Sequence, residues 1–252
     1  MTVILVTGGN RGIGLAIVQA VGTRVADATV LVGCRSTANA EEPIKELKKL
    51  GVPAKLKALE ITITDDASIR AAVKVVEENH GKLDVLINNA AAVTLPKSTD
   101  LTDVRESWAR TLDCVATSQV LVTKAFLPLL RKAEWGRVVM NSSARGSIGR
   151  NIALELPPSP HWLYNCSKAA LNLATIDFRN AEVRDIPDER DHITFWTVSP
   201  GHCKTGFNNF RGVKDPAEGA EVIARLLESK RGEISSATFW EFEEGKFQQV
   251  PW

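Results

Sequence analysis

Thr7-Gly8-Gly9-Asn10-Arg11-Gly12-Ile13-Gly14 is the stretch of sequence that decides the fold. It follows a short apolar run and precedes a segment of helical period that contains Leu15 and Val18. Glycines spaced as TGxxxGxG let the chain turn sharply from a strand into a helix and approach a diphosphate, which the free N–H groups of the helix N-terminus attract. A helix cap or a hairpin would not need three glycines ahead of an amphipathic helix, so the stretch predicts a phosphate-binding turn.

The rest of the chain alternates short β-branched runs with longer amphipathic segments. Most of the runs are continuously apolar, as expected when helices cover both faces of a parallel sheet. Asp65-Asp66 is expected to open one helix that Gly81 ends, and residues 41–50 to form another that Gly51 ends. We predict a single α/β domain over residues 1–252, a Rossmann-type doubly wound parallel sheet of about seven strands with helices on both faces. The expected strands are 3–7, 29–33, 55–59, 83–88, 137–141, 193–198 and 237–242.

Composition narrows the classes of partner. The formal net charge of +1 argues against a protein that binds nucleic acid through its phosphates. No uncharged apolar stretch approaches the roughly 18 residues of a membrane span, and the N-terminal apolar run is too short for a signal peptide. The cysteines are far apart and indicate reduced thiols, so the expectation is a cytoplasmic protein with no membrane partner. They are Cys34, Cys114, Cys166 and Cys203.

The second expected strand ends where a dinucleotide site selects its cofactor. Sites that prefer NAD usually carry an acidic residue here, about 20 residues past the glycines, to bind the ribose 2′-hydroxyl. This chain has Cys34 and Arg35 instead, with Arg11 in the glycine turn. An acid would repel a 2′-phosphate and arginines would hold it, so the sequence favours NADPH over NADH. The alternative is that both are ordinary surface arginines.

Tyr164 and Lys168 are four residues apart in a segment of helical character, which places both on one helix face. Tyr164 is the only tyrosine. A tyrosine whose pKa is near 10 is a poor acid at neutral pH, and a neighbouring ammonium is expected to lower that pKa. YxxxK alone is a common string, and a plain exposed pair would otherwise be the simpler interpretation.

Several motifs occur together in a fixed order. The glycine turn is followed by Asn88-Asn89-Ala90-Ala91, by Ser143 after the fifth expected strand, by YxxxK, and by Pro200-Gly201 with Thr205. This combination resembles the short-chain dehydrogenase/reductase family over nearly the whole chain. The last residues, 239–242 and 250–252, look like those of its carbonyl-reductase-like branch.

The resemblance implies a set of catalytic residues: Ser143 holds the substrate carbonyl oxygen, Tyr164 donates the proton, and Lys168 tunes Tyr164 and binds the nicotinamide ribose. Ser142 is the alternative to Ser143. It also implies that Asn89 contacts the adenosine-side ribose and that Thr205 and the backbone near Cys203 hold the carboxamide. The expected cofactor-binding residues are Gly8, Asn10, Arg11, Gly12, Ile13, Gly14, Arg35, Thr62, Asn89, Lys168, Pro200, Gly201, Cys203 and Thr205.

Three positions depart from the family pattern. Ala91 replaces a glycine, and Thr62 stands where an acidic or amide side chain is expected. Counting back from Gly136 and Ser143, the family asparagine that supports a water-linked proton relay to the lysine falls on Val115. We hypothesise that the relay is absent or built differently and that turnover is slow.

The substrate side is expected in two loops, around 144–163 and 202–215. The longest irregular stretch, 142–160, should wall the site with Pro157, Pro158, Pro160, His161 and Trp162. Phe207 and Phe210 should form a second wall, unless they pack under the sheet. These walls predict reduction of a small apolar ketone or aldehyde with NADPH.

Three alternatives stay open at this point. Two are functional: alcohol oxidation by the same site, and a non-redox dinucleotide-binding or cyclase role because of Val115. The third concerns assembly, since the protein could be a monomer or a homo-oligomer. The four histidines have no metal-ligand spacing, so no metal site is expected.

Overall fold

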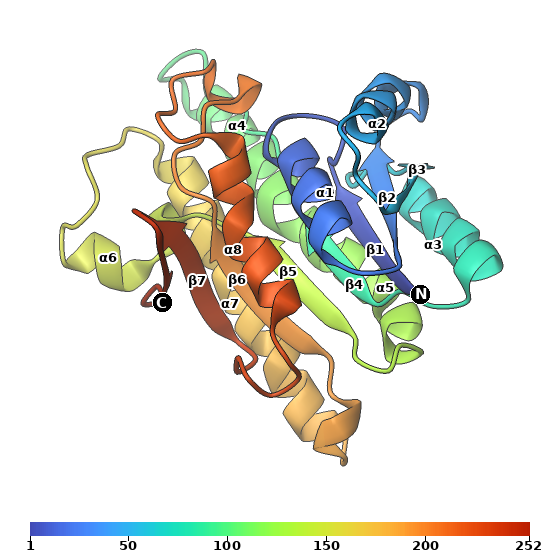
Figure 1. The fold of residues 1–252 in the computed structure, drawn as a ribbon. Coiled ribbons are helices and arrows are strands. Elements are labelled where there is room, and N and C mark those ends of the chain that lie inside the picture. The colour runs from blue at the N-terminus through green and yellow to red at the C-terminus, as the bar shows by residue number, and fades with distance from the viewer.

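A computed structural model describes all 252 residues. Its centre is one eight-stranded sheet in the order β3-β2-β1-β4-β5-β6-β7-β8, with helices on both faces (Figure 1). The prediction of a single doubly wound α/β domain is therefore confirmed. The strands are β1 Thr2–Thr7, β2 Ala28–Cys34, β3 Lys55–Glu60, β4 Val85–Asn88, β5 Arg137–Asn141, β6 Thr194–Ser199, β7 Thr238–Glu243 and β8 Lys246–Gln249.

Seven of these strands begin and end within two residues of the predicted ranges, and β1 to β7 pair in parallel. The eighth was not predicted. β8 pairs antiparallel with β7 after a turn at Glu244 and Gly245, both of which have positive φ. Its sequence, Lys-Phe-Gln-Gln, is mostly polar and exposed because an edge strand has one neighbour and little core to cover. Such a strand lacks the apolar run on which the prediction relied.

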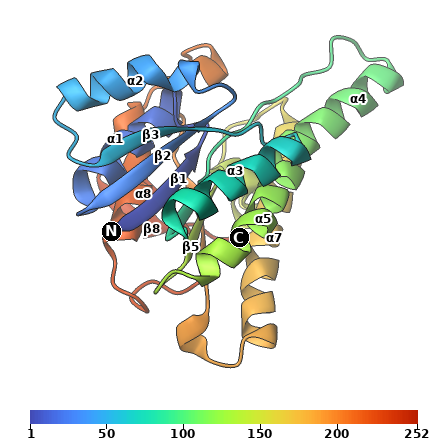
Figure 2. The same ribbon diagram turned by 90° about the vertical axis from the view of Figure 1, so that its right-hand side faces the viewer.

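The helices divide between the two faces of the sheet. Helices α1, α2 and α8 bury their apolar sides in one core cluster, and α3, α5 and α7 bury theirs in the other. Figures 1 and 2 show α1 beside α8 on one face and α3 with α5 on the opposite face. The helices are α1 Gly12–Arg24, α2 Ala38–Lys49, α3 Asp66–His80, α4 Leu101–Leu112, α5 Ser118–Arg131, α6 Ile148–Ile152, α7 Trp162–Asp185 and α8 Pro216–Glu228.

Local chemistry sets the ends of α3 as predicted. The Asp65 side chain accepts hydrogen bonds from the N–H groups of Ala67 and Ser68, and Gly81 closes the helix in the left-handed conformation with φ +71°. Helix α2 begins three residues before the predicted start, at Ala38. Gly51, with φ +79°, follows its end.

Helices α4 and α5 form one continuous segment, Leu101–Arg131, joined by a π-helical turn at Asp113–Thr117. By length and composition alone this segment could cross a membrane, with a mean hydropathy of 1.2 over its most apolar window. Its second half packs into the core through Val122, Phe126 and Leu130, as expected of a helix that covers a sheet.

The stretch 142–160 is more ordered than the sequence predicts. It contains a 3-10 turn at Ala144–Gly146 and the short helix α6. None of the five residues of α6 is buried. Because it is only five residues long and buries no apolar face, this helix leaves no periodic signal in the sequence, and its position depends on contacts made by the rest of the chain.

Candidate active site

The glycine turn between β1 and α1 has the conformation that a diphosphate site needs. Gly8 and Gly12 have φ values of +65° and +55°, which favour glycine. A Cβ on Gly14 would lie 2.1 Å from the carbonyl oxygen of Gly8, so no side chain fits there. Arg11 at the N-cap makes no side-chain capping bond, and the first turn has no acidic residue. The N–H groups at the start of α1 are therefore available to an anion, and the turn fits a dinucleotide.

The Asn89 side chain binds the turn to the neighbouring strands. Its Nδ2 donates to the carbonyl oxygens of Thr7 at 2.9 Å and Gly8 at 3.3 Å, and its Oδ1 accepts from Asn141 Nδ2 at 2.8 Å. The resemblance implies that Asn89 contacts the adenosine-side ribose. Both side-chain hydrogens are used within the protein, and the Asn89 backbone N–H donates to Thr7 Oγ1 at 2.9 Å, so the structure leaves its backbone carbonyl for that contact.

Two cations flank the turn. Arg11 and Arg35 are exposed, and neither forms an ion pair or a side-chain hydrogen bond within the protein. The Gly9 N–H donates to the Gly33 carbonyl at 3.0 Å, which holds the end of β2 and Arg35 next to the turn. Cys34 is buried in the core instead, and burial raises the pKa of its thiol. Of the two neighbours Cys34 and Arg35, only Arg35 can therefore reach a ligand.

Other predicted cofactor residues on this side lie close to the turn. Asn10 donates to the Asn39 carbonyl at 3.4 Å, and Ile13 is half-buried against the core. Thr62 uses its backbone locally, because its N–H donates to Ser68 Oγ at 2.9 Å. The acidic side chain of this region is the exposed Glu60, which ends β3 opposite Cys34 and was not singled out from the sequence.

The end of β6 approaches the glycine turn from the other side. A Cβ on Gly12 would lie 3.5 Å from the Thr205 Cβ, so two segments almost 200 residues apart in the sequence meet here. Pro200 is buried, and its carbonyl accepts a hydrogen bond from the Cys203 thiol at 3.2 Å. Burial raises the pKa of Cys203 to about 11. The Cys203 thiol is therefore protonated at neutral pH. Its backbone N–H donates to the Gly201 carbonyl at 3.1 Å, and its carbonyl accepts from Asn208 Nδ2 at 2.9 Å.

The three predicted catalytic side chains come together where β5 ends. Ser143 follows β5, while Tyr164 and Lys168 lie one turn apart on α7. The Lys168 Nζ lies 5.8 Å from the centre of the Tyr164 ring and donates to the Asn141 carbonyl at 2.6 Å. Ser143 lies close enough to Tyr164 to lower the pKa of the phenol, against the larger opposite effect of burial. The arrangement places a hydroxyl, a phenol and an amine within one small region.

The structure distinguishes Ser143 from its neighbour. Ser142 is buried, and its Oγ donates to the Asn172 Oδ1 at 2.6 Å, inside the contact between β5 and α7. Ser143 is only partly buried and lies near Tyr164, and its Oγ accepts from the Arg145 N–H at 3.2 Å. Ser143 is therefore the serine placed to hold a carbonyl oxygen beside the phenol.

Burial dominates the ionisation of both groups on α7. It raises the pKa of Tyr164, and the nearby Ser143 hydroxyl and the charge of Arg145 act in the opposite direction without overcoming it. Burial also lowers the pKa of Lys168 to about 7. Lys168 is not among the groups that shift the pKa of Tyr164 in the protein alone, so the proposed effect of Lys168 on the phenol stays a prediction. A buried lysine near its own pKa at neutral pH is only partly charged, so it stabilises a phenolate weakly.

Val115 lies fully buried in the π-helical turn between α4 and α5. Its neighbour Cys114 is partly exposed, and burial raises the pKa of that thiol while the charge of Lys168 lowers it. The residue nearest the relay position is thus apolar, with a thiol beside it. A π-helical turn shifts the helix face by one residue, which a count along the sequence does not reveal.

The expected substrate walls lie near the surface. The Phe207 ring centre lies 6.1 Å from that of Tyr164. Phe207 and Phe210 are 56% and 64% exposed, so the alternative that they pack under the sheet is wrong. Trp162 stacks on Trp108 of α4 at 5.1 Å between ring centres. The other predicted wall residues are all exposed: Pro157, Pro158, Pro160 and His161.

A separate cavity of about 390 Å³ lies at the opposite edge of the sheet, beside Gly136 and Ile193 where β5 and β6 begin. Its cations already have partners: Arg131, for example, forms two bonds of 2.5 and 2.7 Å to Glu182. Ligands of open α/β sheets bind at the carboxyl ends of strands, where the glycine turn and Tyr164 lie.

Comparisons with known proteins agree with this geometry. The short chain dehydrogenase model matches residues 2–214. A short-chain dehydrogenase/reductase of Aspergillus fumigatus is 33% identical over 259 residues, covering 99% of this chain and 97% of that protein. The NADPH-bound carbonyl reductase from chicken fatty liver has a TM-score of 0.76 and 26% identity over 100% of both chains. The carbonyl reductase Sniffer of D. melanogaster has a TM-score of 0.78 and 25% identity over 100% of this chain and 99% of that one.

Proposed function

This chain belongs to the short-chain dehydrogenase family of oxidoreductases, and we propose that it reduces an apolar ketone or aldehyde to an alcohol with NADPH. The observation that carries the proposal is the convergence of Ser143, Tyr164 and Lys168 at the carboxyl end of β5. The exposed aromatic side chains beside Tyr164 support an apolar substrate.

The residues of the chain divide the work of the reaction. The Ser143 hydroxyl donates to the carbonyl oxygen and positions it next to the Tyr164 hydroxyl. NADPH, when bound, supplies the hydride for the carbonyl carbon. Tyr164 gives its proton to the oxygen, so the carbonyl gains one hydride and one proton and becomes an alcohol.

Lys168 acts on the phenol rather than on the substrate. In its protonated form it favours the phenolate that remains after proton transfer, and its donation to the Asn141 carbonyl holds the Nζ 5.8 Å from the centre of the Tyr164 ring. With a pKa of about 7, Lys168 can also take up or release a proton at neutral pH. This matches the need to restore the proton on Tyr164 after each turnover.

The preference for NADPH is supported by the two free arginines at the glycine turn. Arg11 and Arg35 lack acidic partners, so neither has to break an ion pair to bind a 2′-phosphate. The chicken carbonyl reductase, 26% identical to this chain, has NADPH bound. Equal use of NADH and NADPH by the purified protein would contradict this part of the proposal.

Replacing Tyr164 by phenylalanine tests the proposed acid. We expect the rate of NADPH oxidation with a panel of apolar ketones to fall about 10²- to 10⁴-fold, because the phenol alone supplies the proton. NADPH affinity, measured by fluorescence titration, should change little. Ser143→Ala and Ser142→Ala form a matched pair, of which only the first should lower kcat strongly. Wild-type activity in Tyr164→Phe would remove Tyr164 as the acid.

A further inference from the structure

Both substrate loops are attached to the same strand by ion pairs. We propose that Glu241 and Glu243 of β7 form a clamp that sets the distance between the two substrate walls, with Arg150 and Lys214 as its partners on the loops. The clamp makes these four residues positioning residues for substrate selection. What the walls enclose rests on the proposed function.

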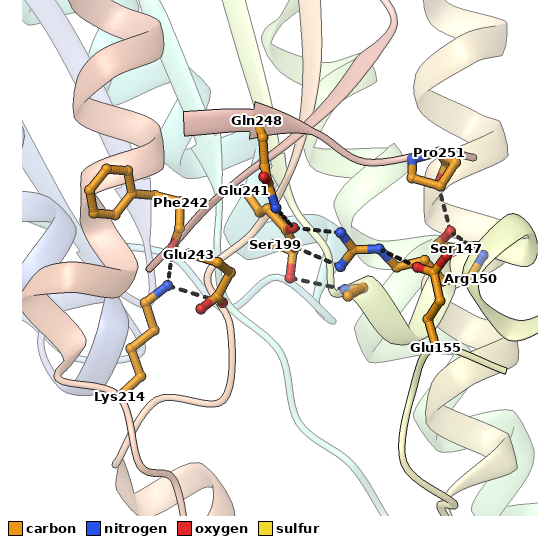
Figure 3. Close-up of polar contacts among 11 residues, drawn as sticks. Ser147, Arg150, Glu155, Ser199, Lys214, Glu241, Phe242, Glu243, Gln248 and Pro251 are labelled. Atoms are coloured by element: carbon orange, nitrogen blue, oxygen red, sulfur yellow. Dashed lines mark hydrogen bonds and ion pairs between the residues drawn. The ribbon is translucent and has the colours of Figure 1, made fainter. Parts of the chain in front are cut away.

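The first loop is held by Arg150 of α6. Its two terminal nitrogens donate to the Glu241 carboxylate at 2.8 and 2.5 Å, and Gln248 of β8 donates to the same carboxylate at 2.7 Å (Figure 3). The Glu241 side chain is only 3% exposed. A fork-to-fork bond of this kind fixes orientation as well as distance. Arg150 follows Ser143 by seven residues, so the pair fixes the segment that leaves the catalytic serine.

No buried apolar contact helps to hold α6 in place. The helix has no buried residue, and its Ile148 and Ile152 side chains face solvent. Its other attachments are polar as well: Ser147 Oγ donates to the Pro251 carbonyl at 2.5 Å, and the Gly149 N–H to the Trp252 carbonyl at 2.7 Å. In Figure 1 the chain end lies beside α6 and β7. The position of α6 therefore depends on polar contacts with the last strand pair and the residues after it.

The second loop is held by Lys214. The Lys214 Nζ contacts Glu243 at 3.1 Å and also donates to the Phe242 carbonyl (Figure 3). The Lys214 backbone closes its own loop, since its carbonyl accepts from the Lys204 N–H at 2.8 Å. This loop carries Phe207, the aromatic ring beside Tyr164.

The Lys214–Glu243 pair also lies next to Gly201, one of the predicted cofactor-binding residues. A Cβ on Gly201 would lie 2.2 Å from the Glu243 Oε1 and 3.0 Å from the Lys214 Cδ. Glu241 and Glu243 are two residues apart in β7, so their side chains project from the same side of the strand. One strand thus holds the loop after Ser143 and the loop that carries Phe207, which are the two predicted substrate walls.

The clamp predicts a change of selectivity rather than a uniform loss. We compare Arg150→Met, Lys214→Met and the charge reversal Arg150→Glu/Glu241→Arg, with Arg184→Met in an exposed pair as control. The ratio of kcat/KM for a bulky and a small ketone should change at least tenfold in Arg150→Met and in Lys214→Met, and return toward the wild-type value in the reversal. An unchanged ratio in both single variants would overturn the clamp, because a purely structural role would change kcat/KM for both ketones by the same factor.

Hydrogen exchange provides a readout that needs no activity. Arg150→Met should speed amide exchange in residues 144–155, Lys214→Met in residues 202–214, and neither in β1 or β4. NADPH affinity of Arg150→Met should stay within about threefold of wild type. Faster exchange in a protein that reduces no carbonyl would uphold the clamp and refute the proposed function. Unchanged exchange in both loops would refute the clamp even in an active enzyme.

Discussion

The cofactor side and the substrate side of this molecule are built by different means. On the cofactor side, the glycines at 8, 12 and 14 keep the turn free of side chains, and a methyl group on Gly14 would collide with the Gly8 carbonyl oxygen. On the substrate side, long charged side chains join residues that are 91 positions apart, as Arg150 and Glu241 are. The glycine turn can follow only one backbone path. The position of a substrate loop can shift when one of its ion-pairing residues is replaced, so the substrate side can change its shape more easily than the cofactor side.

The largest effect we expect concerns the buried amine between these two sides. The pKa of Lys168 is about 7 in the folded protein against an ordinary value of 10.5, a difference worth at most about 5 kcal/mol. Below pH 7 the lysine is charged in both the folded and the unfolded state, and its burial opposes folding by the full amount. As the pH rises from about 7 to 10.5, this cost disappears. Lys168→Met should therefore raise the free energy of unfolding by a few kcal/mol at pH 6.

Urea unfolding at pH 6 and at pH 10 checks this prediction. The gain should be smaller at pH 10, and loss of the 2.6 Å bond to the Asn141 carbonyl should reduce it by about 1 kcal/mol at either pH. Lys74→Met, on the exposed face of α3, is the control. An equal effect of Lys168→Met at the two pH values would show that Lys168 is not desolvated as described. The variant should also lose most of its reductase activity.

Next in size is the response of the glycine turn to one methyl group. In Gly14→Ala the Cβ would meet the Gly8 carbonyl oxygen, so the turn must move; we expect a loss of about 1–3 kcal/mol in stability and at least tenfold in NADPH affinity. Gly149→Ala is the matched change on the substrate side. Its Cβ would lie 3.1 Å from the Trp252 carbonyl, which can move slightly. Calorimetric titration with NADPH should separate the two variants. Equal NADPH affinities would show that the glycine turn is no more constrained than the substrate side.

A smaller effect is expected at the cofactor-selecting arginine. Arg35→Ser removes an unpaired charge beside the turn, so the ratio of kcat/KM for NADPH over NADH should fall about tenfold. Stability should not change, because Arg35 makes no ion pair in the protein. Steady-state kinetics with both cofactors measure the ratio, with Arg184→Ser as control. A constant ratio would mean that Arg35 is an ordinary surface residue.

The smallest effect concerns the position where the family carries an asparagine. Val115→Asn should raise turnover severalfold if a relay to Lys168 can form there, while an amide without partners in this fully buried site should lower stability by about 1–3 kcal/mol. Stopped-flow rates and melting temperature measure the two effects separately. Unchanged kinetics would count against the relay hypothesis.

The predictions from sequence succeeded where a local rule applies. Continuous apolar runs gave seven strands, Asp65 and Gly81 gave both ends of α3, and the spacing of Tyr164 and Lys168 placed them on one helix face. They failed where no periodic signal exists. The polar edge strand β8 and the short helix α6 bury little apolar surface, so hydrophobic pattern could not reveal them.

What the sequence determined by itself is the α/β order of elements, the glycine turn and the identity of the residues that meet at the site. These follow from backbone sterics and from the period of apolar residues, which act over a few neighbours. Only the tertiary structure decided that burial raises the pKa of Tyr164 and lowers that of Lys168, and that β7 holds both substrate loops. Desolvation and long-range ion pairs depend on which distant segments surround a group, and that information is not contained in any local stretch of the chain.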